Sequence, residues 1–239
     1  MTITMQFGRY RARLAAGDDD LQACQALRHL CFFGKTGLDR DDFDPRCQHL
    51  MIEDAEGRLI AAARMLLIAD AGDLPGCYAA QYYDLSGLAG QAGPMMELGR
   101  FCISPDLQDA DVVRAAWGAL TQIVDDAGVR MLFGCTSFAG TDTAVYGVAL
   151  ARLAARSVGP DGLRPGIKAP EVVRLKDARA RGKAPLPSLL RSYLAMGGWV
   201  SDHAVIDRAM NTFHVFTCVD IAAVPPARAK AIRAALGAG

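Results

Sequence analysis

The sequence predicts a mixed α/β (α+β) fold in which helices flank a central sheet. Three observations lead to this prediction. Stretches with apolar residues at helical spacing alternate along the chain with short apolar runs bounded by turn residues. Two of these runs surround a short glycine-containing turn, which indicates an antiparallel hairpin. The chain has 239 residues and is 51% hydrophobic, enough for a sizeable core, and we expect one domain over residues 1–239.

The first half of the chain is expected to contain a helix, the hairpin and a third strand. Three consecutive aspartates precede apolar residues at helical spacing, so acidic groups stand at the positive end of a helix over about 19–33. A polar, acidic loop follows this helix. The hairpin then pairs residues 49–54 with residues 58–68, and a third strand is expected over 94–104.

The second half is expected to continue with alternating helices and strands. A helix begins at Asp111, after which apolar residues again recur at helical spacing. A short buried strand follows over 129–135. The remaining expected elements are a helix from Thr141 to about Arg156, a helix over 189–196, a strand over 212–219 and a short basic helix over about 227–236.

A basic, loop-rich segment over about 157–188 interrupts these elements. Between Arg152 and Arg191 the chain has ten lysine or arginine residues, three acidic residues and five prolines. Because proline disfavours helices and central strands, we expect an insertion of exposed loops rather than a packed layer. Such a surface could dock an acidic protein or an anionic bilayer.

Composition argues against several classes of protein. The 26 basic and 26 acidic residues give a net charge of zero, so a globally basic nucleic-acid binder is not expected, and no nucleic acid is expected as a partner. No stretch approaches the roughly 18 apolar residues of a membrane span. The N-terminus also lacks the pattern of a secretory signal. A cytoplasmic protein is expected, and peripheral attachment to an anionic inner membrane stays open.

The cysteines and histidines give no metal signature. The seven cysteines are scattered and form no Cys-x-x-Cys pair, so free thiols are expected. Cys47 and His49 have the spacing of two ligands, but no second pair stands at zinc-like spacing. His49 is therefore expected to be a hydrogen-bonded strand residue, and neither a metal nor a cofactor is expected.

Two charged residues, Glu97 and Arg100, lie in the strand expected over 94–104. Side chains alternate between the faces of a strand, so these two point to opposite sides unless a bulge intervenes, and Gly99 is the candidate for one. Buried charges are costly unless they are paired. Two interpretations stay open: a structural ion pair, or a carboxylate that accepts a proton beside an arginine that orients the neighbouring loop.

Two further arginines need an explanation. Arg64 interrupts an apolar strand and needs an acidic partner, which the loop over 41–44 or Glu97 could supply, unless it lies at a sheet edge with its head in water. Arg28 belongs to the first helix, where an arginine on the surface is ordinary.

Two strand-to-helix connections are candidate binding loops. Residues 104–113 lack the glycines of a phosphate-binding loop, and their aspartates would repel a pyrophosphate. Residues 134–142 are rich in small residues. Cys135 or Ser137 as a nucleophile lacks an evident base, so backbone contact with a substrate is the preferred interpretation, with capping of the next helix by Asp142 as the alternative.

Several motifs occur in an order that resembles one family. They are Gln25-Ala-Leu-Arg28, Phe32, Asp42-Phe-Asp44, Cys47-Gln-His-Leu50, Arg64-Met-Leu66, Tyr82-Tyr-Asp-Leu85, Glu97-Leu-Gly-Arg100, Leu132 to Asp142 and Leu189 to Gly197. Over about residues 9–219 this series resembles the L-ornithine Nα-acyltransferases of ornithine-lipid synthesis. That family belongs to the GNAT-like superfamily and is distantly similar to the acyl-homoserine-lactone synthases.

The resemblance implies a GNAT-like sheet and a specific reaction. A 3-hydroxyacyl chain would pass from acyl carrier protein to the α-amine of L-ornithine and give lyso-ornithine lipid. The weak phosphate loop makes free coenzyme A a less expected donor than a carrier-bound chain. Two alternatives are kept: a signal synthase that uses S-adenosylmethionine, and a non-catalytic module that binds acyl carrier protein or lipid.

The resemblance also assigns site residues. Glu97 is expected in an open cleft as general base, with Arg100 beside it in the catalytic site. Arg64 or Arg100 would bind the ornithine carboxylate, and Asp42 or Asp44 its δ-ammonium. The full substrate-binding set is Arg28, Phe32, Asp42, Asp44, His49, Arg64, Phe101, Cys102, Ser137 and Asp142. The acidic carrier would dock on Arg114, Arg152, Arg156, Lys168 and Arg174.

Overall fold

The computed structural model describes residues 4–107, 109–179 and 181–234. The chain divides into two compact units. Unit 1 takes residues 1–67, 98–128 and 226–239, and unit 2 takes residues 68–97 and 129–225. The strand β6 (Met95–Ile103) begins in unit 2 and ends in unit 1. The single domain expected over the whole chain stays a prediction.

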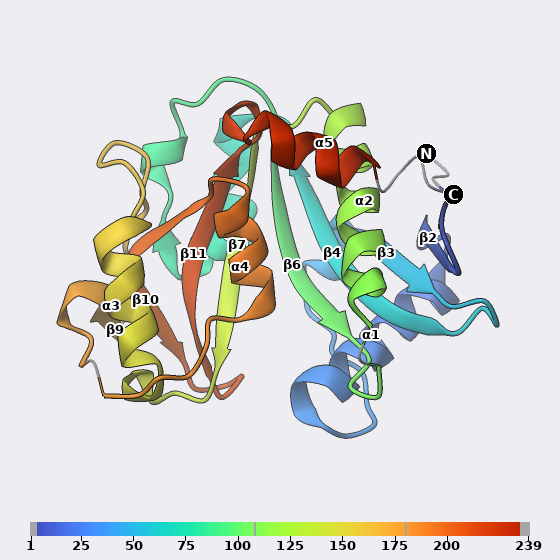
Figure 1. Ribbon diagram of the computed structural model, residues 1–239, viewed down its shortest axis with the longest axis horizontal. Coiled ribbons are helices and arrows are strands. Elements are labelled where there is room, and N and C mark those ends of the chain that lie inside the picture. The colour runs from blue at the N-terminus through green and yellow to red at the C-terminus, as the bar shows by residue number, and fades with distance from the viewer. Residues whose placement is uncertain (1–3, 108, 180, 235–239) are drawn as a thin grey trace. The chain divides into compact units, whose positions relative to one another are not determined.

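Unit 1 is a sheet with a long helix on each face (Figure 1). Its strands are antiparallel neighbours in the order β1 (Thr4–Phe7), β2 (Tyr10–Leu14), β3 (Gln48–Glu53) and β4 (Leu59–Ile68), followed by the second half of β6. Helix α1 (Asp18–Phe33) packs Cys24 and Leu27 onto one face, and α2 (Ala110–Asp126) covers the other. A Cβ on Gly118 would lie 2.5 Å from the ring of Phe7, so glycine is required where α2 meets the sheet.

Unit 2 contains a mixed sheet in the order β6, β7 (Met131–Ala139), β11 (Thr212–Asp220), β10 (Trp199–Asp207) and β9 (Val172–Arg174). The pair β6 and β7 is parallel, and the other pairs are antiparallel. Helices α3 (Gly147–Arg156) and α4 (Ser188–Ala195) cover one face around Phe138 and Phe213 (Figure 1). A small second sheet pairs β5 (Tyr83–Asp84) with β8 (Gly166–Ile167).

The expected fold class is confirmed, and most expected elements exist. The helix over 19–33 is α1, the hairpin is β3 and β4, and the strand over 94–104 is β6. The helices expected from Asp111 and over 189–196 are α2 and α4, and the strand over 212–219 is β11. The basic tail helix is α5 (Pro226–Ala234), and the last two residues expected in it lie outside the described residues.

Three expectations about local structure are wrong. Residues 134–139 belong to β7, which pairs with β11 along its whole length, so the turn begins only at Gly140. The next helix opens as a 3-10 turn over Thr143–Tyr146 and becomes α3 at Gly147. The strands β1, β2 and β10 were not expected: β1 and β2 alternate polar and apolar residues but are only four and five residues long, and Ser201 and His203 interrupt the apolar run of β10.

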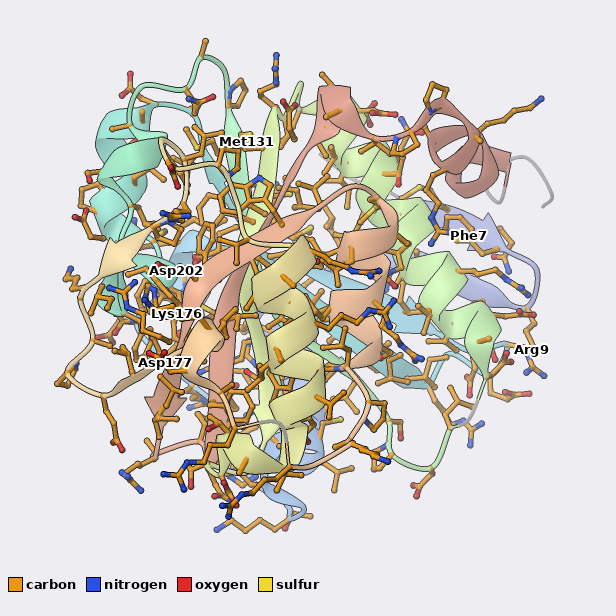
Figure 2. All side chains as sticks on the ribbon, turned by 60° about the vertical axis from the view of Figure 1, so that its left-hand side comes forward. Phe7, Arg9, Met131, Lys176, Asp177 and Asp202 are labelled. Carbon is orange, nitrogen blue, oxygen red and sulfur yellow. The ribbon has the colours of Figure 1, made fainter. Side chains whose placement is uncertain are left out.

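The basic segment is partly built into the fold, which corrects the expectation of exposed loops alone. Its strand β9 joins the edge of the sheet beside β10, and Leu175 is buried against the helices. In Figure 2 the labelled Lys176 and Asp177, which follow β9, lie near Asp202 of β10. Prolines flank β9 without entering it, so the edge strand can pair.

Within the described residues, no helix is long and apolar enough to cross a membrane. All seven cysteines are free thiols.

Candidate functional site

Unit 1 buries a cluster of three arginines and three aspartates, which we call the Arg/Asp cluster: Arg28, Arg64, Arg100, Asp39, Asp41 and Asp44. Helix α1 supplies the first arginine, β4 the second and β6 the third. The aspartates all come from the loop between α1 and β3. Local sequence explains part of this loop, because Pro45 suits the first turn of the 3-10 helix over Asp44–Arg46 that holds the buried Asp44.

Asp44 lies at the centre of the Arg/Asp cluster. Its two oxygens accept bonds from Arg28 Nη1 and Nη2, both at 2.9 Å, and from Arg64 Nη1 and Gln25 Nε2, both at 2.8 Å. Burial alone would raise the pKa of Asp44, but these bonds outweigh it and hold the pKa well below its usual range. Four donors fill the accepting positions of one carboxylate, so Asp44 organises the cluster rather than meeting a substrate ammonium.

Arg28 is fully buried, with 1% of its surface exposed, which corrects the expectation of a surface arginine. Its Nε donates to Asp39 Oδ2 at 2.9 Å, and its Nη2 also donates to the carbonyl of Asp39. The guanidinium therefore joins two turns of the acidic loop to α1. A bidentate fork of this kind fixes geometry as well as charge.

Arg64 has the acidic partner that its position in an apolar strand requires. It pairs with Asp41 and Asp44, and its guanidinium lies 5.6 Å from the ring centre of Phe43. The expected partner loop is thus confirmed, and the alternative of a sheet-edge arginine in water is wrong, because Arg64 is buried. The burial of both charges is tolerated only because they are paired.

Arg100 has an unusual backbone. Its φ is +52°, a left-handed conformation that costs an ordinary residue about 1–2 kcal/mol. The expected irregularity at Gly99 is therefore displaced by one residue, and a Cβ on Gly99 would point into open space. Arg100 Nε donates to Asp39 at 3.0 Å, its Nη2 lies 3.4 Å from Asp41, and Phe32 lies beneath the guanidinium. With 14% of its side chain exposed, Arg100 is the most accessible arginine of the cluster.

His49 is a hydrogen-bonded strand residue, as expected. Its Nε2 lies 3.1 Å from the carbonyl of Asp44, and burial lowers its pKa. The ring is therefore neutral at physiological pH and supports the Arg/Asp cluster from β3.

Glu97 lies in the first half of β6, in unit 2, and it is 5% exposed. Its oxygens accept backbone N–H bonds from Tyr78 at 2.8 Å and Ala79 at 2.6 Å. These residues open a 3-10 turn over Ala79–Gln81, so the carboxylate anchors that turn. Glu97 is thus buried and bonded to backbone, and the open cleft expected beside it stays a prediction.

The other expected substrate residues lie in varied surroundings. Cys102 is buried in the core beneath α1, and Phe101 and Phe32 are half-buried. Asp42 is exposed. Ser137 is exposed on β7, and Asp142 caps the 3-10 turn by accepting a bond from Ala144 N–H at 2.9 Å. The structure brings together the residues of the Arg/Asp cluster, and it places Ser137 and Asp142 in unit 2.

The expected docking residues divide into two groups. Three of them are engaged: Arg114 pairs with Asp111, Arg174 pairs with Asp202, and Lys168 Nζ donates to the carbonyl of Ala80 at 2.6 Å. Arg114 also belongs to unit 1, whereas the others belong to unit 2. The remaining two, Arg152 and Arg156, are exposed on α3.

Sequence reasoning missed Asp39 and did not include Asp41 in the site. Both lie in the acidic loop, and the sequence did contain a signal for them. Three arginines in apolar surroundings need carboxylate partners, and this loop offers a run of aspartates. It also missed Tyr78 and His214, whose surroundings depend on long-range packing that no local motif indicates.

The start of α2 carries its own negative charge. Asp109 caps the helix by accepting from Asp111 N–H at 2.8 Å, and it also accepts from Tyr10 Oη at 2.6 Å and from Arg9. A carboxylate held in this way occupies the helix end where a phosphate would otherwise bind.

Residues 28–118 match a family model described as an acetyltransferase (GNAT) domain. With the mixed sheet and its flanking helices, this match defines the class: the protein is an acyltransferase of the GNAT type.

The L-ornithine N(alpha)-acyltransferase of Rhodobacter capsulatus is 33% identical over 236 residues, covering 90% of this chain and 91% of the relative. The protein of the same name from Brucella abortus is 28% identical, covering 90% and 86%. The chain therefore belongs to the L-ornithine Nα-acyltransferase family, and the resemblance stated from the motifs is confirmed. Among solved structures, an N-acyl amino acid synthase from uncultured soil microbes is 10% identical, with a TM-score of 0.46 and coverage of 90% and 92%.

Proposed function

We propose that the protein transfers a 3-hydroxyacyl chain from acyl carrier protein to the α-amine of L-ornithine, which gives lyso-ornithine lipid. The observation that carries this proposal is 33% identity, over nearly the full length of both chains, to a protein named for acylation of ornithine at that amine. The Arg/Asp cluster supplies the partly exposed Arg100, and the loop of its aspartates also carries the exposed Asp42.

The reaction joins two groups and releases a third. The neutral α-amine attacks the thioester carbonyl, the C–N bond forms and the C–S bond breaks. The amine loses one proton, and the phosphopantetheine thiolate takes up one proton as it leaves. An amino group with a pKa of about 8 is mostly protonated at neutral pH, so a proton acceptor near it is useful. The oxyanion that forms transiently would be stabilised by backbone amides near Phe101.

Glu97 is our candidate proton acceptor, acting through a water. Replacing Glu97 by Gln should lower kcat by on the order of 10²–10⁴ if the carboxylate takes the proton. Because Glu97 also anchors the turn at Tyr78 and Ala79, thermal unfolding and ornithine KM should be measured for the same variant. A near-normal kcat would assign Glu97 the structural role alone.

Arg100 and Asp42 are the candidates for holding ornithine. Of the two arginines considered for the carboxylate, Arg100 is the more exposed, whereas Arg64 is buried among aspartates. Of the two aspartates considered for the δ-ammonium, Asp42 is exposed and Asp44 is filled by four donors. These assignments supersede Arg64 and Asp44 as direct contacts.

The charge of the α2 N-terminus supports a carrier-bound donor. Asp109 places a carboxylate at the amides that would otherwise bind an anion, so a nucleotide phosphate would meet repulsion there. A donor held by protein contacts avoids this helix end. Free coenzyme A is accordingly the less favoured donor, and no resident cofactor is proposed.

The exposed face of α3 is the proposed landing surface for the acidic carrier. Arg152 and Arg156 lie there with the exposed Val148, and Val145 is exposed on the 3-10 turn just before α3, so basic and apolar groups are combined. Reversing both charges to glutamate should raise the KM for acyl carrier protein several-fold, most strongly at low salt. Reversal of Arg58, an exposed arginine of unit 1, is the matched control. An unchanged KM would place docking elsewhere, and the same face could instead rest on anionic lipid.

One assay tests the whole proposal. Purified protein is incubated with 3-hydroxyacyl carrier protein and a panel of amino acids, or with S-adenosylmethionine, and free thiol and product mass are measured. Thiol release with ornithine and a product heavier by one acyl group are expected. Release only with S-adenosylmethionine would identify a signal synthase, and binding of the carrier without release would identify a non-catalytic module.

A further inference from the structure

The side chain of His214 in β11 is buried, with 2% of its surface exposed, and its two ring nitrogens differ. Nδ1 lies 3.1 Å from the hydroxyl of Tyr83, and that hydroxyl donates to the carbonyl of His214 at 3.0 Å. A phenol has one hydrogen, so Nδ1 must carry the proton between the two side chains. Nε2 therefore presents a lone pair, and no donor among the described residues reaches it.

Burial lowers the pKa of His214 to about 4, so the ring is neutral at physiological pH. Nε2 is then an acceptor and not a donor. A buried acceptor without a partner is destabilising, and native proteins seldom leave one unless a water or a ligand fills it.

A tyrosine ring lies against this imidazole. The ring of Tyr82 meets His214 edge-on, with 5.0 Å between ring centres, and its hydroxyl lies 3.4 Å from that of Tyr78. Burial raises the pKa of Tyr82, so its phenol keeps the proton that it can donate. Tyr82 and His214 thus offer one donor and one acceptor from adjacent side chains.

Both groups belong to the face of unit 2 that α3 and α4 leave uncovered. Ser137, the register partner of His214 on β7, is exposed, whereas the rings of Tyr82 and Tyr83 cover His214 itself, so a ligand reaches Nε2 only past the half-buried Tyr82. The hydroxyl pair Tyr78 and Tyr82 also flanks the turn that Glu97 anchors through the N–H groups of Tyr78 and Ala79. Tyr78 therefore contacts Glu97 through its backbone N–H and Tyr82 through its hydroxyl, and Tyr82 contacts His214 through its ring.

We propose that His214 Nε2 and the Tyr82 hydroxyl form the site that recognises the 3-hydroxyl group of the acyl donor. This inference rests on the proposed acyl transfer. A secondary alcohol can donate to Nε2 and accept from Tyr82 at the same time. A methylene can do neither and a ketone can only accept, so both leave the lone pair of Nε2 unfilled. The site should favour 3-hydroxyacyl over 3-oxoacyl and unsubstituted chains.

The test compares donors of equal chain length that carry a 3-hydroxyl, a 3-oxo or no substituent. Wild-type kcat/KM should favour the 3-hydroxyacyl donor about tenfold or more over the unsubstituted one. The variants Tyr82→Phe and His214→Phe should each lower this preference about tenfold. Tyr146→Phe is the matched control, because Tyr146 packs against Phe138 and Phe213 on the opposite face of the sheet.

A binding arm separates this inference from the proposed function. Calorimetry measures 3-hydroxyacyl-pantetheine and acyl-pantetheine on each protein without ornithine. If no donor acylates ornithine, the proposed function fails, but a hydroxyl preference in binding that both variants lose still supports the site. Two results would overturn the proposed site: equal binding of both probes by wild type, or a preference that survives Tyr82→Phe. The lone pair of His214 Nε2 would then be assigned to a water. Tyr82 is half-buried, so that variant decides the matter even if His214→Phe fails to fold.

Discussion

Each unit of the molecule buries a polar network, and the two networks differ in charge. In unit 1 the Arg/Asp cluster consists of full charges, three of each sign, and Asp44 accepts from two arginines at once. In unit 2 the corresponding groups are neutral: Tyr82, Tyr83 and His214 interact through single hydrogen bonds and ring edges. The charged network is stable only when every charge has its partner, whereas the neutral network tolerates one hydrogen-bond acceptor without a donor.

This difference indicates what each network can do. Removing one member of a matched set of buried charges leaves the others uncompensated, so the Arg/Asp cluster fixes the acidic loop in one arrangement. A neutral network with an unfilled acceptor can receive a ligand group without disturbing a charge balance. The comparison therefore predicts an Arg/Asp cluster that keeps its charges in mild acid and a neutral network around His214 whose contribution to stability falls there.

The largest effect is expected from breaking the charged network. Replacing Arg28 by Ala should lower the free energy of unfolding by about 3–5 kcal/mol, because Asp39 and Asp44 then lose their buried partner. Urea unfolding of wild type and variant measures this loss in the free energy of unfolding. The control is Arg58→Ala, because Arg58 is 77% exposed and its loss should leave unfolding unchanged within error. If both variants unfold alike, the cluster does not hold unit 1 together.

A smaller effect is expected from acid, and it should come from unit 2. The pKa of His214 is about 4 in the folded protein against 6.5 ordinarily, so between these values the unfolded chain binds the proton and the folded chain does not. Stability is therefore fully present above pH 6.5 and falls as the pH drops toward 4. The loss from this group is about 3 kcal/mol at most.

Urea unfolding between pH 7 and pH 4.5 measures the loss, and His214→Phe should reduce the slope. A remaining slope is expected from His49 and His203, whose pKa values burial also lowers. Asp20 and Asp44 titrate elsewhere, because their lowered pKa values hold their contribution until the pH falls below about 4. A wild-type curve that is flat from pH 7 to pH 4.5 would contradict the assignment of a neutral buried His214.

More of the fold than of the candidate site could be predicted from the sequence. Helical spacing after the aspartates before α1 and after Asp111 was enough to place α1 and α2, because both helices have one apolar face. The strand β10 was not predicted, because it is buried on both faces and contains Ser201 and His203, which interrupt the apolar run. The strand β9 was not predicted either, because an edge strand of three residues is too short to show a hydrophobic pattern.

For the site, the need for charge compensation was predictable and the partners were not. An arginine in an apolar strand requires a carboxylate, and that reasoning correctly led from Arg64 to the acidic loop. The choice of Asp39 for Arg28 and Arg100 depends on loop geometry. The left-handed backbone at Arg100 instead of Gly99 runs against residue preference, so only tertiary contacts can fix it.

The carboxylate of Asp109, at the first turn of α2, has a consequence in a cell that contains other acyl donors. Since the Asp109 carboxylate already accepts from Asp111 N–H, with Arg9 and Tyr10 bound to it, an anionic nucleotide would meet a negative charge at this helix end and stabilise the fold little. Abundant coenzyme A thioesters would then neither steady the fold nor crowd out the intended donor. If the proposed function holds, this one acidic side chain would make the use of carrier-bound chains independent of the level of coenzyme A thioesters.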